Sequence, residues 1–437
     1  MAKRPTASST SAGSSDHVGT SAFDDMLLQA QQRGDESLQT GRYVITYRDN
    51  AVEEGAAFLE TLGLRAADAR DFAGQAVSVE DVGDADALVL PEIGVAVVSA
   101  EAAQARELGV QEFAAAESAV EAIEPEYFVF ADQLNADYLR GFRQAVEAIA
   151  AEAGLKSGLF EDELEVDAQV VGATWGLSAC KVPPSSRSGA GIRVAVLDTG
   201  MALNHPDFLG RSFTVQTFVG QPVNDLHGHG THCIGTACGP KAPIGTTPRY
   251  GIGFQTPIFA GKVLSNSGSG ATGGVLAGMN WAIANRCPVI SMSLGSQSPP
   301  QAAYTAAGRA ALANGCLIVA AAGNAASQTG SPANSPTIMS VASLDANLSP
   351  SSFSNFGKIE IAAPGRDVFS SAPMPQRYRT MSGTSMATPH VAGCAALWAQ
   401  TSPSLRGQAL WNKLLATARP LPFPATRVGK GLVQAPI

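Results

Sequence analysis

The sequence is poor in charge, and the charge that it has is not basic. Charged residues make up 15% of the 437 positions, and 38 acidic residues against 29 basic ones leave a net charge of −9. A protein that binds nucleic acid usually presents a basic face, and no block of lysines or arginines provides one here. The composition therefore argues against nucleic acid as a partner.

Cysteines and long apolar runs are also scarce. The six cysteines are scattered, with no C-x-x-C pair and with Cys233 and Cys238 as the closest two, so we expect buried free thiols rather than a disulfide framework. No uninterrupted apolar run is long enough to span a bilayer, and the first 30 residues contain no apolar stretch of the secretory type. We therefore expect no membrane partner and a cytoplasmic location, with export by another route left open.

Small and apolar residues are abundant instead. Hydrophobic residues make up 45% of the chain and glycines number 45, which is typical of globular domains with tight turns. Changes in texture along the chain predict four parts. These are a flexible leader (1–40), a small α+β domain (41–131), a linker with one helix at 138–154 (132–171) and a larger domain (172–437).

The α+β domain is predicted from an alternation of short patterns. A strand at 42–47, "RYVITY", precedes a helical pattern at 51–64, and two strands flank Pro91. A second helix at 102–109 and a strand at 120–131 complete the unit.

In residues 172–437, near-continuous apolar runs such as "IRVAVLDTG", "VISMSLG" and "LIVAAAGN" alternate with helical stretches. Such runs indicate strands buried on both faces. We therefore predict an α/β fold with a mostly parallel sheet flanked by helices.

Polar residues follow several of these expected strands. Asp198 and Asn324 each follow a buried run, and residues 291–295, "SMSLG", end another. In open α/β sheets, function gathers at the carboxyl ends of the strands. Taken singly, Asp198 is weak evidence for a catalytic acid, because aspartate is common in turns. Asn324 could equally be a turn residue or a hydrogen-bond donor to an oxyanion. The backbone of 291–295 could pair with an extended peptide.

Half of the histidines, His227, His229 and His232, fall in the stretch "HGHGTHCIGT". Clustered imidazoles can bind zinc, for which Asp225 and Cys233 are the nearby ligand types, but no H-E-x-x-H pattern is present. The alternatives are a solvated glycine-rich loop or a single catalytic imidazole at the start of a helix.

The stretch "GTSMATPHVAG", 383–393, places Ser385 at the expected N-terminus of an apolar helix. Free amides and the helix dipole favour negative charge at such a position. Pro389 is expected in the first turn or so, which a helix tolerates. The motif is not G-x-S-x-G, which disfavours an α/β-hydrolase elbow. The alternative is a purely structural role, as a buried helix that begins with small residues.

Together these residues have the order Asp, His, Asn, Ser. With "VAVLDTG", "HGHGTHCIGT", "SMSLG", "AAAGN", "GTSMATPHVAG" and "GKGLV", the chain resembles the subtilisin-like serine peptidases over nearly all of residues 172–437. The resemblance implies a serine endopeptidase that acts through an acyl-enzyme and requires no cofactor. It assigns Asp198 to orienting the imidazole, His229 to general base and acid, Ser385 to nucleophile and Asn324 to oxyanion donor. Substrate backbone would bind along Ser293, Leu294 and Gly295.

Residues 41–131 resemble the inhibitor-type prodomain of the same family, in "RYVITY" and "VEAIEPEYFVFA". The resemblance implies a folding chaperone whose C-terminal tail lies in the active site. The chain would then be a self-processed, autoinhibited precursor, with protein or peptide substrates and its own prodomain as intramolecular inhibitor. Self-cleavage is implied near Ala131-Asp132, and the long spacer makes a cut nearer Val171 the alternative.

Three further expectations follow from the resemblance. Asp207 matches a calcium ligand of the family, but "GPKAPIGTTPRYGIG" does not match its calcium loop, so calcium is possible without being supported by the sequence. Cys233 resembles the free cysteine of the proteinase K-like members and predicts sensitivity to mercurials. The short, uncharged segment 325–336 fits an S1 pocket for apolar or small side chains.

Two other functions stay open on the sequence alone. One is a binding or regulatory module that keeps the fold and never releases its prodomain. The other is a zinc hydrolase that uses the histidine cluster, which chelation would inactivate.

Overall fold

The computed structural model describes residues 26–27, 38–105, 119–131, 172–245 and 247–437. Most of the predicted leader therefore lies outside the described residues. So do the predicted linker with its helix at 138–154, the end of the helix predicted at 102–109 and the alternative cut near Val171.

The N-terminal unit has the predicted α+β composition. The two helices pack with the strands around buried residues such as Ile45, Leu59 and Val98. A short strand and three single turns of 3-10 helix, β2 and η1–η3, add to the predicted elements. In chain order the unit contains β1 (Gln39–Tyr47), α2 (Val52–Thr61), β2 (Ala66–Asp68), η1 (Ala69–Asp71), η2 (Ala73–Gln75), η3 (Val79–Asp81), β3 (Ala87–Leu90), β4 (Val95–Val98), α3 (Ala100–Ala105) and β5 (Val120–Phe130).

The larger unit is built on a seven-stranded sheet in the order β13-β12-β11-β10-β6-β8-β7, and all neighbouring strands pair in parallel. This confirms the predicted α/β class with a mostly parallel sheet. The strands are β6 (Val194–Asp198), β7 (Phe213–Thr217), β8 (Ile258–Lys262), β10 (Val289–Met292), β11 (Leu317–Ala321), β12 (Met339–Leu344) and β13 (Ile361–Pro364).

Helices cover both faces of this sheet, which explains the near-continuous apolar strands. Alternate residues of β6 show the two cores. Val194 and Val196 pack with α7 (His229–Cys238), α10 (Thr384–Thr401) and α11 (Gly407–Thr417). Ala195 and Leu197 pack with α8 (Thr272–Ala284) and α9 (Ala302–Ala313). The remaining elements are α6 (Trp175–Ala179), η4 (Pro206–Phe208), β9 (Ser269–Ala271), β14 (Val368–Ser371), β15 (Tyr378–Met381) and α12 (Ala425–Val428).

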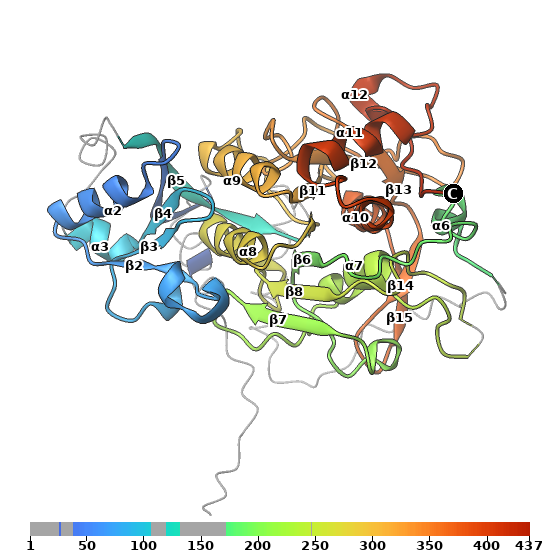
Figure 1. Cartoon of the computed structure of the whole chain (residues 1–437), viewed down its shortest axis with the longest axis horizontal. Coiled ribbons are helices and arrows are strands. Elements are labelled where there is room, and N and C mark those ends of the chain that lie inside the picture. The colour runs from blue at the N-terminus through green and yellow to red at the C-terminus, as the bar shows by residue number, and fades with distance from the viewer. Residues whose placement is uncertain (1–25, 28–37, 106–118, 132–171, 246) are drawn as a thin grey trace, which may run out of the picture.

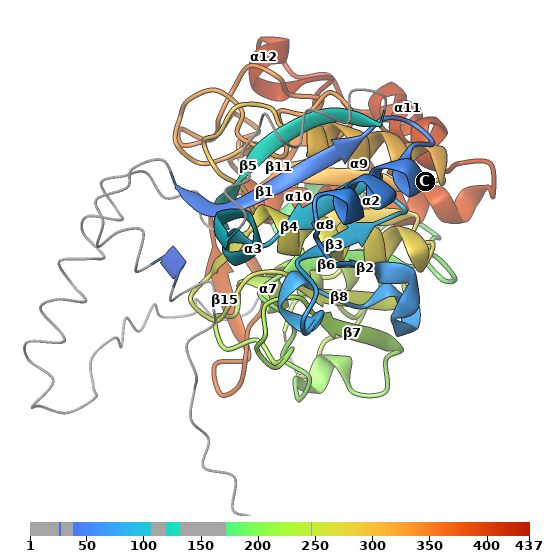
Figure 2. The same cartoon turned by 90° about the vertical axis from the view of Figure 1, so that its left-hand side faces the viewer.

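The two units share a second sheet. The N-terminal unit lies beside α8 and α9 (Figures 1 and 2), and its last strand, β5, pairs with β1 on one side and β9 on the other. The resulting order, β2-β3-β4-β1-β5-β9, makes β5 the link between the units. The C-terminal end of β5 is thereby brought to the carboxyl edge of the parallel sheet.

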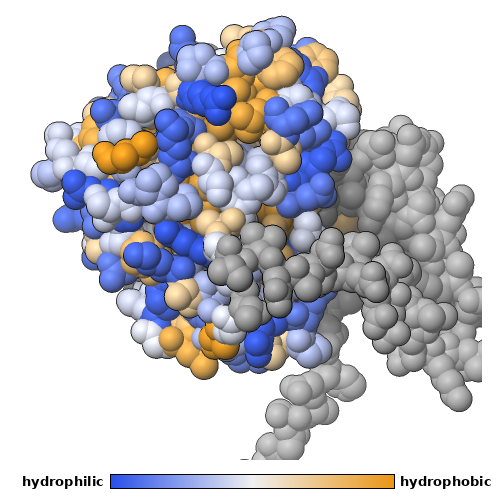
Figure 3. All heavy atoms as spheres, turned by 90° about the vertical axis from the view of Figure 1, so that its right-hand side faces the viewer, coloured by the Kyte–Doolittle hydropathy of each residue, from blue (hydrophilic) through white to orange (hydrophobic). Residues whose placement is uncertain are grey.

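On the face shown in Figure 3, apolar side chains form small areas separated by polar ones. Among the described residues, no helix is both long and apolar enough to cross a membrane.

Candidate active site

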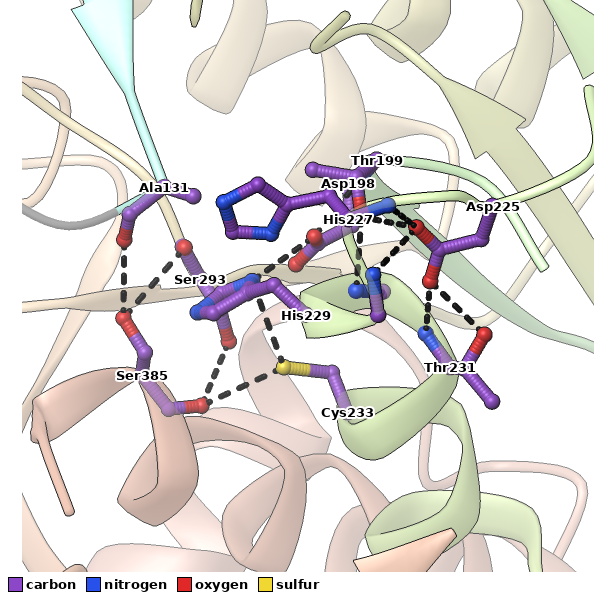
Figure 4. Close-up of polar contacts among 12 residues, drawn as sticks. Ala131, Asp198, Thr199, Asp225, His227, His229, Thr231, Cys233, Ser293 and Ser385 are labelled. Atoms are coloured by element: carbon purple, nitrogen blue, oxygen red, sulfur yellow. Dashed lines mark hydrogen bonds and ion pairs between the residues drawn. The ribbon is translucent and has the colours of Figure 1, made fainter. Parts of the chain in front are cut away.

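The predicted site residues come from strand ends and helix starts that meet at one place (Figure 4). Asp198 is the last residue of β6, His229 the first of α7 and Ser385 the second of α10. All three are at least 98% buried with the N-terminal unit in place. The order of the elements therefore gathers residues that lie up to 187 positions apart in the sequence.

Asp198 and His229 form a close pair. His229 Nδ1 lies 2.8 Å from Asp198 Oδ1, which also accepts from the Thr199 amide at 2.7 Å. Because Nδ1 donates its proton to the carboxylate, the neutral ring keeps its lone pair on Nε2. His229 Nε2 is buried and has no hydrogen-bond partner, so this nitrogen is free to accept a proton.

The charge around His229 favours its protonated form. Burial alone would lower the pKa of His229, but the Asp198 carboxylate raises it well above the ordinary value of 6.5, with a further contribution from Cys233. Burial raises the pKa of Cys233 itself, so this residue is a neutral thiol near pH 7 and the carboxylate is the main opposing charge. The ring can therefore become a stabilised cation when it takes up a proton.

The Ser385 hydroxyl points at the end of β5. Ser385 Oγ donates to the carbonyl oxygen of Ala131 at 3.2 Å, and the carbonyl oxygen of Ser293 lies 3.4 Å away (Figure 4). With the tail in place, this hydroxyl makes its hydrogen bonds to backbone carbonyls rather than to the free nitrogen of His229.

The position of Pro389 differs from the prediction and explains a contact of Ser385. Pro389 is the sixth residue of α10 and lies in its second turn rather than its first. It has no N–H to donate to the carbonyl oxygen four residues earlier, which belongs to Ser385. Ser293 Oγ donates to that oxygen at 2.7 Å instead, and Cys233 Sγ lies 3.5 Å from it. Pro389 thereby gives Ser293 and Cys233 a role in holding the serine.

Asn324 lies just beyond β11, and its side-chain amide has a fixed orientation. Its Oδ1 accepts from the Thr384 amide at 2.8 Å and from Thr384 Oγ1 at 2.9 Å. These two donors identify the oxygen, so the Nδ2 donor is the end left for other partners. A Cβ built on Gly383 would lie 3.2 Å from Nδ2, which places this amide beside the residue that precedes Thr384 and Ser385.

A groove beside these residues holds β5 as an extra strand. Gly295, in the predicted wall of Ser293, Leu294 and Gly295, exchanges two backbone hydrogen bonds with Phe130 at 3.0 and 3.1 Å. On the other side, β9 pairs with residues 128–130, and the Ala131 amide donates to the Gly268 carbonyl at 2.9 Å. The first edge lies in the stretch that was predicted to bind substrate backbone. The second edge was not predicted, because "SGSGA" contains no strand signal beyond small residues.

Two acidic residues of β5, also missed by the prediction, bind the helices on which the N-terminal unit lies. Glu126 accepts from the Gly273 amide in the first turn of α8 at 2.7 Å, and Glu124 accepts from the Ala303 amide in the first turn of α9 at 3.3 Å. Glu126 is fully buried and also accepts from Thr40 Oγ1 at 2.5 Å, with Arg42 Nε at 3.8 Å. Burial raises the pKa of Glu126, against the opposing effect of the Arg42 guanidinium. The spacing of Glu124 and Glu126 by two residues is the signal that places both on one face of a strand.

The three clustered histidines do not form one ligand set. Among the described residues, Asp198, His229 and Cys233 are the group whose ligand atoms lie together, within 4.8 Å. His232 Nε2 instead donates to the Val368 carbonyl at 2.9 Å, and burial lowers the pKa of this residue to about 3. The rings of His227 and His229 are 6.2 Å apart between centroids.

Asp207, the residue that matches a calcium ligand, is engaged by protein donors. Its Oδ2 accepts from the hydroxyls of Tyr250 at 2.6 Å and Tyr378 at 2.9 Å, and its Oδ1 accepts from the Ile244 amide at 3.3 Å. Both of its oxygens therefore accept hydrogen bonds from protein donors.

Comparison with known proteins identifies the class to which this fold and site belong. The model of the subtilase family matches residues 189–432, more than half of the chain. The chain therefore belongs to the subtilase family, and it is a subtilisin-like serine endopeptidase.

Several named relatives match this chain over most of their own length. The chain is 40% identical to subtilisin Savinase of Lederbergia lenta over 270 residues, which is 60% of this chain and 96% of that protein. It is 38% identical to subtilisin DY of Bacillus licheniformis, over 59% of this chain and 94% of the relative. A crystal structure of a cold adapted subtilisin-like serine proteinase matches 61% of this chain and 99% of its own, with 35% identity and a TM-score of 0.53.

Proposed function

We propose that this endopeptidase is made as an autoinhibited precursor, which cuts its own chain with Asp198, His229 and Ser385. Residues 41–131 form the prodomain, and the last strand of that prodomain occupies the substrate groove. The released peptidase domain then cleaves protein or peptide substrates that bind in the same groove as an added strand.

In this mechanism Ser385 attacks a carbonyl carbon of a strand lying between Gly295 and β9. The hydroxyl first turns from the Ala131 and Ser293 carbonyls toward His229 Nε2, which takes its proton as the Oγ–C bond forms. Asp198 holds the ring by Nδ1 and stabilises the resulting cation. His229 then gives the proton to the leaving amine as the C–N bond breaks, and a water molecule hydrolyses the acyl-enzyme by the reverse proton path.

Asn324 is assigned to the charge that develops on the carbonyl oxygen. Its Oδ1 is held by two donors from Thr384, so its Nδ2 is pre-oriented before the reaction begins. The N-terminus of α10 adds a favourable dipole at Ser385. No step requires a metal ion, and calcium stays an untested possibility that the sequence does not support.

Autoinhibition is supported by how the tail is held. The end of β5 is bonded on both sides, by Gly295 and by Gly268, while Glu126 fixes its upstream part to α8. A product that keeps these contacts after cleavage would block access to Ser385. The cut is assigned to the Ala131–Asp132 bond, because Ala131 is the tail residue whose carbonyl contacts the Ser385 hydroxyl.

That contact between Ser385 and Ala131 is the observation that carries the proposal. The test is to treat the matured protein with a fluorophosphonate probe in the presence of EDTA, and to sequence the new N-terminus. Labelling of Ser385 with a new N-terminus at Asp132 is the expected result. Failure to label after complete removal of the prodomain would exclude the serine mechanism. Activity that EDTA abolishes and that serine reagents leave intact would favour the zinc alternative.

A further inference from the structure

The helix that begins with His229 has an unusual N-terminus. Its N-cap is Gly228, which has φ of 89° and no side chain to accept a hydrogen bond. The first amides of a helix have no partner within the helix and need acceptors from elsewhere. In α7 those acceptors are side chains from two other segments.

Asp225 binds both the residues that precede α7 and its first turn. Its Oδ1 accepts from the Gly228 amide at 2.7 Å and the His227 amide at 3.0 Å. Its Oδ2 accepts from the amide and the hydroxyl of Thr231 at 2.8 and 2.7 Å. The side chain is 1% exposed, so these bonds replace solvation of a buried carboxylate. The first turn of α7 is therefore held from the loop that precedes it.

The Asp225 carboxylate also binds the segment that carries Asp198. Thr199, which follows Asp198, donates from Oγ1 to Asp225 Oδ1 at 2.9 Å. Thr199 Oγ1 in turn accepts from the Gly230 amide at 2.8 Å, while the Thr199 amide donates to Asp198 Oδ1 at 2.7 Å. Asp225 and Thr199 together form a bridge between the end of β6 and the start of α7.

At this bridge, the backbone of α7 packs closely against the loop that follows β6. A Cβ built on Gly230 would lie 2.4 Å from the Gly200 carbonyl oxygen, so the backbone of α7 lies directly against the loop after β6. The Thr231 hydroxyl also accepts from the Ala202 amide at 3.0 Å, which adds a second tie. A shift of either segment would change the 2.8 Å separation of His229 Nδ1 and Asp198 Oδ1.

We infer that Asp225 is a positioning residue of the catalytic site: acting through Thr199 and the first turn of α7, it sets the distance and orientation between Asp198 and His229. This inference rests on the proposed function, because it takes that pair to be catalytic. Asp225 itself contacts neither the tail strand nor Ser385 through any of these bonds.

The experiment compares three variants in the full-length protein. Asp225→Asn keeps the shape of the side chain. Its NH₂ group, however, must face hydrogen-bond donors at the position of one of the two carboxylate oxygens, so the bonds made there are lost. Thr199→Val breaks the bridge without changing charge, and it keeps the test usable if Asp225→Asn does not fold. Asp207→Asn is the matched control. Asp207 is another buried aspartate, and it accepts three hydrogen bonds, none of which involves Asp198 or His229. Each variant is matured with a trace of tagged wild-type enzyme, which is then removed.

Active sites are counted with the fluorophosphonate probe, so that kcat refers to folded, reactive enzyme. In Asp225→Asn and Thr199→Val, kcat per titrated site is expected to fall about ten- to a hundredfold, as for small misplacements of reacting groups, with KM within about twofold because the groove is untouched. The acid limb of kcat/KM should move to lower pH in both, since a looser contact with Asp198 raises the pKa of His229 less. Asp207→Asn should lower the Tm and leave both readouts unchanged.

If Asp225→Asn and Thr199→Val lower only the Tm, and kcat per site and the pH profile match the wild type, the inference is wrong and Asp225 is a structural cap. A failure of the proposed function looks different, because the wild type would then show no site that the probe titrates.

Discussion

The carbonyl oxygen of Ala131 and the hydroxyl of Ser385 lie 3.2 Å apart, although 254 positions separate them in the sequence. This contact joins the two units of the chain at the point where the proposed nucleophile, at the start of α10, meets the end of β5. In the proposed function, the N-terminal unit occupies the groove that a substrate would need. The predictions below test the parts of that arrangement separately.

The first prediction concerns pH. The Asp198 carboxylate raises the pKa of His229 above 6.5, and catalysis needs the neutral ring as the base. Activity should therefore be low where the ring is protonated, and rise as the pH increases through a value above 6.5. The measurement is kcat/KM of the matured enzyme against pH. An acid limb centred at or below 6.5 would contradict the assigned interaction.

The second prediction concerns Asn324. Asn324→Ala removes the amide assigned to the oxyanion, so kcat should fall by about 10²–10³, a range that comes from subtilisin itself, a member of this family. KM should change little, because Gly295 and Gly268 bind the substrate backbone independently. Initial rates normalised to titrated sites give both constants. A rise in KM with kcat unchanged would instead assign Asn324 to ground-state binding.

The third prediction concerns Cys233. Its thiol lies 3.9 Å from His229 Nδ1 and 3.5 Å from the Ser385 carbonyl oxygen, so a bound mercury atom would displace both residues. A mercurial should inactivate the matured enzyme, and Cys233→Ala should be resistant. The variant serves as its own control, because the five other cysteines, which are also buried, remain in it. Equal sensitivity of Cys233→Ala would place the reactive thiol elsewhere.

The fourth prediction concerns the hold of the prodomain. Glu126→Ala removes a fully buried carboxylate that binds α8, Thr40 and Arg42. Losing one partner of such a buried, hydrogen-bonded cluster costs about 2–5 kcal/mol, which corresponds to at least about thirtyfold weaker inhibition. Free active sites are measured as the self-processed complex is diluted.

The matched control for Glu126 is Glu121→Ala. Glu121 pairs with Arg309 at 3.2 Å across the same interface, but both side chains are about 40% exposed. Exposed ion pairs contribute about 0–1 kcal/mol, so this variant should weaken inhibition at most about fivefold. Similar losses in the two variants would show that burial of Glu126 is not what holds the tail.

The sequence predicted the fold class because strands buried on both faces leave a clear apolar pattern, as Val194–Asp198 does. Asp198, His229 and Ser385 each mark an expected element boundary, and the resemblance to the subtilisin-like peptidases implied that these three residues would meet. The resemblance implied that the tail of residues 41–131 lies in the active site, but the sequence did not indicate which segments would pair with that tail. Nothing local in "SGSGA" indicates a strand, since β9 forms only where β5 supplies its partner.

The position of Pro389 within α10 is a second feature that the sequence could not predict. The sequence places a proline in the helix but gives no register for its N-terminus, and a shift of a few residues decides which carbonyl loses its donor. That carbonyl belongs to Ser385, and its replacement donors come from Ser293 and Cys233. Long-range side-chain partners of this kind, including those of Asp225, appear only in the folded chain.

The most direct test is the intact mass of the purified wild-type protein beside Ser385→Ala. We expect the wild type to separate into fragments that end at Ala131 and begin at Asp132, while the variant remains a single chain of 437 residues. Cleavage at the same bond in Ser385→Ala, expressed and purified without other proteases, would contradict the central claim. Two intact proteins would leave a subtilisin-like fold whose tail is held but never cut.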